Sequence, residues 1–400
     1  MAIRGRGLIQ VLLAVLLCAA SLQFAAPAHA KTLTVCADGC DFETIAAALE
    51  DADDGDVISI GDGTFEGGVV VDKKVTLRGA GRDTTTIRGP SDESVVRVGK
   101  RAKVRIEAVT IAGGGGSAIG ANAIGGGGIL NEGDLVLSDS VVRDNTVATS
   151  GGRTRLGGGI YSDSTKPVRI RDSVIAGNQA TGGGGGVYVR DGDVDIVGTT
   201  ISGNQGGGSG SGNGGGIHLA GSETMQIVDC TISDNQAHLG GGVFASAPLR
   251  VTDSTISGNR AFGGGGIASQ TGKLLKVVGS AIGENRSTVS GGGISVGAGG
   301  LALIDSTVEN NESRNGGGIV TDDGDLSIED SAISGNIASA NGGGIFNRFG
   351  KKIDLVNSQV IDNRAGDLGG GVFGSGRLVI HSGSVVAGNE PDQCVPVSCG

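Results

Sequence analysis

The sequence has no tryptophan, two tyrosines, eight phenylalanines and six prolines in 400 residues. So few aromatic side chains disfavour a polysaccharide-degrading groove that stacks sugars on many rings. So few prolines, without a strict three-residue period, exclude a collagen-like chain despite 80 glycines. The content of Ile, Val and Leu is too high for a disordered chain. A glycine-rich repeat architecture remains.

Long apolar segments are also scarce. The one at residues 8–20 is short for a membrane span. It follows Arg4 and Arg6 and precedes an Ala-His-Ala site at residues 28–30, which together predict a signal peptide over residues 1–30. A secreted or cell-envelope location follows, with no transmembrane segment in the mature chain.

The charge balance is acidic. Because Arg4 and Arg6 are lost with the leader, 29 basic against 42 acidic residues leave the mature chain at −13. This surplus disfavours nucleic acid and anionic lipid as partners. A polysaccharide or a cell-surface protein is the expected partner, bound by a monomer.

Two motifs repeat in register. Gly-Gly-Gly followed by Ile or Val occurs ten times, and Ile/Val-x-x-Asn is interleaved with it at a distance of 16 to 18 residues. The asparagines are Asn145, Asn178, Asn204, Asn235, Asn259, Asn285, Asn311, Asn336, Asn363 and Asn389. Between the motifs, apolar residues alternate with a period of two, as in strands. Strands this short are stable only when stacked.

The expected fold is therefore an all-β, right-handed parallel β-helix, with two or three strands per coil. The Asn side chains are expected to form a buried ladder, at corners where Asn also tolerates a left-handed backbone. Residues 31–124 read as an N-terminal cap and degenerate first coils, residues 125–389 as ten repeats and residues 390–400 as a tail. A short helix with Asp41 as N-cap and Ile45 and Leu49 on its apolar face covers the first coil.

The cysteines fit an exported protein. Cys36 and Cys40 are expected to form one local disulfide, and Cys394 and Cys399 another. Cys230 takes a position that is Ser or Thr in other repeats, which predicts a buried free thiol. Cys18 leaves with the leader. The four histidines are scattered, so we expect no metal site and no cofactor.

The paired motifs resemble the polymorphic outer membrane protein repeat, which has Gly-Gly-Ala-apolar and Phe-x-x-Asn. Residues 44–45, 61–65 and 77–81 resemble the first coils of the pectate lyase-like superfamily. The resemblance implies an adhesin-like surface or secreted protein, with outer-membrane association. The alternative it implies is a polysaccharide lyase or glycoside hydrolase.

The residues of catalysis are not recognisable as a set. Galacturonase-like members carry Asn-Thr-Asp, a paired Asp and Gly-His-Gly, and this set is missing from the sequence. Lyases use a basic residue, and one outward strand position holds Arg169, Arg250 and Lys276. Asp195 and Gln226 interrupt that column, which favours a solvated face. The sequence thus names no catalytic residue and favours a non-catalytic binding protein.

Candidate binding residues follow the glycine motif, where the side chain is expected to point outward. Successive repeats place there Tyr161, Tyr188, His218 and Phe244. Rings about 4.8 Å apart would form a flat platform for sugars or an apolar partner. The alternative is a cross-strand ladder that only stabilises the sheet.

Two insertions, at residues 146–156 and 206–213, lengthen one corner of the repeat. The first carries Arg153 and Arg155, a basic spot on an acidic chain. Insertions in solenoids commonly lie on the binding face. The hypothesis is that these loops and the aromatic row form one recognition patch.

Overall fold

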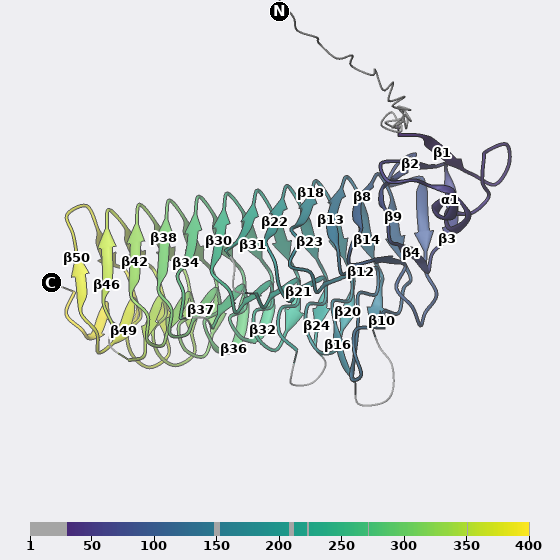
Figure 1. Cartoon of the computed structure of the whole chain (residues 1–400). Helices are drawn as coiled ribbons and strands as arrows, with labels where there is room; N and C mark the ends of the chain where they lie inside the picture. Colours follow the sequence, from purple (N-terminus) through teal and green to yellow (C-terminus); the bar gives the residue numbers. More distant parts are fainter. Residues whose placement is uncertain are drawn as a thin grey trace, which may run out of the picture.

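The computed structural model describes residues 30–147, 153–207, 212–221, 224–270, 272–349 and 351–399. These residues form a long rod of stacked parallel strands, with a short helix at its N-terminal end (Figure 1). The chain advances coil by coil from the purple end to the yellow end. The expected parallel β-helix is confirmed.

Four stacks of strands run along the rod, and we name them sheets A to D. Sheet A consists of β1 (Thr32–Val35), β2 (Val57–Ile60), β5 (Lys74–Gly79), β8 (Lys103–Glu107), β13 (Asp134–Ser138), β18 (Val168–Arg171), β22 (Val194–Val197), β26 (Met225–Val228), β30 (Leu249–Thr252), β34 (Leu275–Val278), β38 (Leu301–Ile304), β42 (Leu326–Glu329), β46 (Ile353–Val356) and β50 (Leu378–Ile380). Sheet B consists of β3 (Gly63–Glu66), β6 (Thr85–Arg88), β9 (Thr110–Ala112), β14 (Val141–Arg143), β19 (Val174–Ala176), β23 (Thr200–Ser202), β27 (Thr231–Ser233), β31 (Thr255–Ser257), β35 (Ala281–Gly283), β39 (Thr307–Glu309), β43 (Ala332–Ser334), β47 (Gln359–Ile361) and β51 (Val385–Ala387).

Sheet C consists of β4 (Val69–Val71), β7 (Val96–Val98), β12 (Ile129–Asn131), β17 (Ile160–Ser162), β21 (Val187–Val189), β25 (Ile217–Leu219), β29 (Val243–Ala245), β33 (Ile267–Ser269), β37 (Ile294–Val296), β41 (Ile319–Thr321), β45 (Ile345–Asn347), β49 (Val372–Gly374) and β52 (Cys394–Pro396). Sheet D consists of β15 (Thr146–Val147), β20 (Gln179–Ala180), β24 (Gln205–Gly206), β28 (Gln236–Ala237), β32 (Arg260–Gly263), β36 (Arg286–Ser290), β40 (Glu312–Ser313), β44 (Ile337–Ala338) and β48 (Arg364–Ala365). A small accessory sheet joins β10 (Ser117–Ala118), β11 (Ala123–Gly125) and β16 (Thr154–Leu156).

One coil shows the path of the chain. It runs through β21 in sheet C, β22 in sheet A, β23 in sheet B and β24 in sheet D, and then returns to sheet C. The first coils, such as β5, β6 and β7, have three strands, within the expected two or three, and sheet D adds a fourth strand from β15 onward. Most strands of sheet D have two residues, which is too short to show an alternating pattern.

The core is a column of like residues inside the rod. In the coil above, Val187, Ile196 and Ile201 are completely buried, and each pairs with an apolar residue in the next coil. Burying each such side chain contributes about 1.5–3 kcal/mol. Stacking therefore stabilises coils that could not fold singly.

The glycine triplet is required by both backbone angle and space. Gly157 has a φ of 61°, which other residues adopt at a cost. A Cβ on Gly158 would lie 2.4 Å from the carbonyl oxygen of Gly185, and one on Gly159 would lie 2.6 Å from that of Gly186. The motif therefore marks a place where successive coils approach too closely for a side chain.

The asparagine ladder is confirmed, and all ten residues of the motif are buried. The backbone N–H and the Nδ2 of Asn178 each donate to Oδ1 of Asn204 at 3.0 Å, and its Nδ2 also donates to the Val142 carbonyl at 2.9 Å. The left-handed backbone lies one residue earlier than expected, for example at Gly177 with a φ of 64°. The turn is made there, which leaves the Asn side chain free to point inward.

The helix α1 (Ile45–Asp51) lies at the N-terminal end of the rod (Figure 1). Its Ile45 and Leu49 are buried, as expected. The expected N-cap is wrong, because the Thr44 side chain accepts from the Ala47 N–H at 3.2 Å. Asp41 instead accepts from both the backbone N–H and the hydroxyl of Thr34 at 2.9 and 2.7 Å.

Both expected disulfides, Cys36–Cys40 and Cys394–Cys399, are present. Cys230 is a buried free thiol, as expected. It belongs to a second ladder, in which the Cys230 N–H donates to the Ser254 hydroxyl at 3.1 Å. Burial raises the pKa of its thiol to about 11.

Candidate binding surfaces

The predicted aromatic row exists on the outer side of sheet C. Tyr161, Tyr188, His218 and Phe244 occupy paired positions in β17, β21, β25 and β29. Their ring centroids are 5.5, 4.4 and 4.8 Å apart in that order. The planes are inclined by 19°, 40° and 62°, so the row is not the flat platform that we expected.

Much of the row is covered. Tyr161 is 1% exposed and Phe244 is 3% exposed, whereas Tyr188 and His218 are half-buried. The corner between sheets D and C packs over the rings: Nδ1 of His218 lies 3.1 Å from the Asn213 carbonyl oxygen. Tyr161 lies so close to Gly125 of β11 that a Cβ there would be 2.9 Å from its ring. The sequence could not show this cover, because it depends on how the preceding corner and the neighbouring coil pack against the rings.

Burial also decides the charge of the row. It raises the pKa of Tyr161 to about 12 and lowers the pKa of His218 to about 4. Both rings are therefore neutral at pH 7. Beside them, Arg190 pairs with Asp163 at 2.9 Å. The geometry is that of a stabilising ladder with two partly accessible rings.

The first insertion lies next to this row. β16 pairs with β11, the strand that contacts Tyr161. Arg153 is exposed, and Arg155 is half-buried and donates to the Thr181 hydroxyl at 3.3 Å. Residues 148–152 and 208–211, which hold the middle of both insertions, lie outside the described residues. The structure thus brings Arg155 and Tyr161 into one region, and a binding role for them stays a prediction.

The outer side of sheet A carries a cationic face that the sequence analysis did not find. Between β5 and β22, six basic residues stand against three acidic ones, on a chain whose overall charge is negative. The six are Lys74, Arg78, Lys103, Arg105, Arg169 and Arg171. We call these residues the cationic face.

The carboxylates of this region lie beneath the cations. Glu107 pairs with two basic residues, Asp134 with two and Asp195 with one. The paired basic side chains are 40–67% exposed, whereas the three acidic side chains are 20–36% exposed. Longer basic side chains reach past their shorter partners, so positive charge is what meets the solvent. The alternation of basic and apolar residues in β5, β8 and β18 was the available signal.

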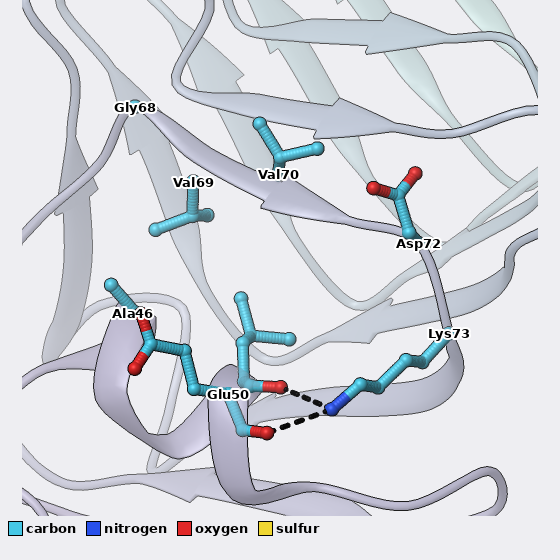
Figure 2. Close-up of a pocket in the computed structure, with 8 residues that line it drawn as sticks. Ala46, Glu50, Gly68, Val69, Val70, Asp72 and Lys73 are labelled. Atoms are coloured by element: carbon cyan, nitrogen blue, oxygen red, sulfur yellow. Dashed lines mark hydrogen bonds between the residues drawn. The ribbon is translucent and has the colours of Figure 1, made fainter.

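A groove of about 350 Å³ lies at the N-terminal end, between α1 and β4 (Figure 2). Lys73 points along it and donates to the carbonyls of Leu49, Glu50 and Ala52 at 2.8, 2.9 and 2.6 Å. These carbonyls end the helix, where a positive charge is favourable. Lys73 therefore fixes α1 over the first coil.

Within the described ranges, His, Cys, Asp and Glu residues form no group arranged to hold a metal ion. No helix among those residues is long and apolar enough to cross a bilayer.

The stacked sheets define the protein as a parallel β-solenoid that offers elongated, repetitive outer faces. The chain belongs to the right-handed β-helix family: the model described as "Right handed beta helix region" matches residues 73–282, 158–332 and 216–390. No curated protein matches the sequence.

Solved structures are similar to this chain at low sequence identity. The A-module of the mannuronan C-5 epimerase AlgE6 from Azotobacter vinelandii is 13% identical, with a TM-score of 0.50, over 86% of this chain and 94% of that chain. The Dettilon tailspike protein gp208 is 14% identical, with a TM-score of 0.47, over 84% and 62%. An alginate lyase from Paenibacillus sp. FPU-7 is 14% identical, with a TM-score of 0.38, over 69% and 95%. The likeness to the epimerase module concerns the fold alone.

Proposed function

We propose that this protein is an exported, non-catalytic, adhesin-like rod that binds an acidic polysaccharide along the cationic face of sheet A. The observation that carries the proposal is the layered charge of that face, with basic side chains above their carboxylate partners. Anionic groups of a polymer would meet these cations before meeting any acid.

The shape of the face fits an extended polymer. Its strands are stacked about 4.8 Å apart, so basic groups recur at short intervals along the rod. Exposed ion pairs of this kind are worth only about 0–1 kcal/mol each, which lets a ligand share the cations at little cost. Several weak contacts along one chain then add up through effective concentration.

The alternative function is a polysaccharide lyase or glycoside hydrolase. One observation favours it, because Arg169 lies 3.8 Å from Asp134, which places a candidate base beside a carboxylate. A lyase would release products with an unsaturated sugar, which absorb ultraviolet light. Incubation with alginate, pectate and glycosaminoglycans therefore separates the two functions.

The binding test compares alginate and pectate with neutral dextran. The triple variant Lys103→Glu, Arg105→Glu, Arg169→Glu should weaken binding to the acidic polymers by about tenfold or more, since three contacts of about 0.5–1 kcal/mol are lost. The control carries the same change of charge at Arg314, Arg348 and Lys351. The proposal would be refuted if both variants bound the acidic polymers equally well, or if the parent protein bound neutral dextran as well as it bound the acidic polymers.

A further inference from the structure

A second groove lies on the outer side of sheet D, and none of its lining residues belongs to the cationic face. It has a volume of about 520 Å³ and runs across β28, β32 and β36. Its lining includes Gln236, Arg260, Phe262, Arg286 and Thr288. All five side chains are exposed.

A local irregularity lies within this groove. β32 and β36 have four and five residues, and the register between them shifts between Ala261 and Gly263. The cause is visible in the sequence, since Asn285 precedes its next glycine-motif Ile by nine residues and Asn259 by eight. An extra residue of this kind forms a β-bulge, which re-aims neighbouring side chains.

A stacked aromatic pair lies at the groove, with Phe262 exposed and His238 half-buried behind it. His238 and Phe262 stack with ring centroids 4.9 Å apart and planes inclined by 16°. Phe262 is 49% exposed, in contrast to the covered ends of the row on sheet C. An accessible ring of this kind suits the apolar face of a sugar.

Two guanidinium groups lie beside the ring. Arg260 and Arg286 are partners in the register of β32 and β36, so like charges stand on adjacent coils. Such pairs are unfavourable unless an anion lies between them. Arg286 pairs with Glu312 at 3.0 Å, while Arg260 makes no ion pair with any described residue. Arg260 and Phe262 point to the same side because they are two residues apart in one strand.

We propose that this groove binds a uronic acid residue of a polysaccharide. The sugar carboxylate lies between Arg260 and Arg286, because guanidinium groups match a carboxylate with paired hydrogen bonds. The sugar ring lies on Phe262, and Gln236 and Thr288 hydrogen-bond its hydroxyl groups. The site rests on different residues from the cationic face and stands whether or not that face binds polymer.

The test measures binding of a short oligouronate, an oligogalacturonate of four residues, by the NMR signals of the His238 ring. These signals report on the groove itself, since His238 stacks on Phe262. The oligouronate should shift them, and the double variant Arg260→Gln, Arg286→Gln should weaken binding at least about tenfold. Phe262→Ala should weaken it by a similar factor.

The controls use matched residues of the same chain. Arg364→Gln changes an exposed arginine at the start of another sheet D strand, β48, and Phe349→Ala removes another exposed phenylalanine. Both should bind as the parent protein does. The triple variant of the cationic face should also bind the oligouronate at this groove, which separates this proposal from the preceding one.

Three results would overturn the proposal. Unchanged binding of the oligouronate by the double Arg variant would show that the guanidinium groups do not bind the sugar carboxylate. Equal shifts with neutral maltotetraose would show a site for rings without a charge requirement. Equal shifts with sodium sulfate, at the same concentration of anion, would show a site for small anions in which the sugar plays no part.

Discussion

The corner between sheets B and D keeps one spacing in every repeat, whereas the corner between sheets D and C varies in length. Measured from the ladder Asn to the next glycine-motif residue, the variable corner spans 8 to 15 residues. At the constant corner, side chains such as Asn259 are buried and bonded to the coils on both sides. At the variable corner, segments lie over the outside of sheet C. The hydrogen bonds that fix the register of the coils are thus concentrated at the corner between sheets B and D, and the corner between sheets D and C can change in length.

Replacement of a ladder residue should show the largest effect. Asn259→Ala removes an acceptor for the N–H and Nδ2 of Asn235 and a donor to Asn285, all buried. Each buried group left unpaired costs about 1–3 kcal/mol, so the free energy of unfolding should fall by about 4 kcal/mol. Urea denaturation measures it. Asn213→Ala, at the variable corner, is the control and should cost less than about 1 kcal/mol. Similar losses in both variants would remove the contrast between the corners.

The pH dependence of stability should report on His218, which the variable corner covers. Its pKa falls from 6.5 to about 4 because burial disfavours the charged form. The unfolded chain then binds more protons between these values, so stability is complete above pH 6.5 and decreases as the pH falls toward 4. The loss should approach about 3 kcal/mol.

Comparison with His218→Gln isolates this contribution from that of the carboxylates. The variant should lose less stability between pH 6.5 and 4 than the parent. An NMR titration of His218 with a midpoint near 6.5 would show instead that the corner leaves the ring open to water.

Removal of a covered ring should have a smaller effect. Tyr161→Ala should lower the free energy of unfolding by about 2 kcal/mol, because a fully covered ring and its stacking on Tyr188 are lost. Phe373→Ala, at the other aromatic stack, should cost about 1 kcal/mol, since that ring is only half-buried. A Tyr161 variant with unchanged stability and reduced polysaccharide binding would support the recognition patch over the ladder.

The smallest effect is expected at Cys230, in the ladder between sheets A and B. Cys230→Ser should change the free energy of unfolding by less than about 1 kcal/mol, because a hydroxyl fits the position that Ser254 takes in the next coil. Burial raises the pKa of the thiol to about 11, so iodoacetamide should react only with unfolded protein. Rapid reaction of the native protein would show that the ladder opens there.

The sequence predicted those features that repeat with the coil. The glycine triplets, the asparagine ladder and buried residues such as Ile256 follow from spacing alone, because stacking puts equivalent residues into equivalent environments. Asp41 and Thr44 were harder to distinguish, since both are good N-caps and only tertiary contact with Thr34 assigns the first.

The surfaces were less predictable because they depend on neighbouring coils. Whether Tyr161 is open depends on β11, in the preceding coil, and on β16, in the corner that leads into β17. The cationic face depends on how far Arg169 and Asp134 reach from the sheet, which a column of alternating charges does not reveal. The stack of His238 on Phe262 joins residues that share no motif.

The asparagine ladder ends in an amide from outside the repeat. Asn389 donates from its N–H and Nδ2 to Oε1 of Gln393 at 3.1 and 2.8 Å, so Gln393 takes the place of an eleventh ladder residue. The ladder therefore ends through hydrogen bonds to Gln393 alone, whatever the number of coils before it. Duplication or loss of one repeat would lengthen or shorten the rod by about 4.8 Å without disturbing either end. The number of repeats that the gene encodes therefore sets the distance between the two ends of the rod, and this distance can change in steps of one coil.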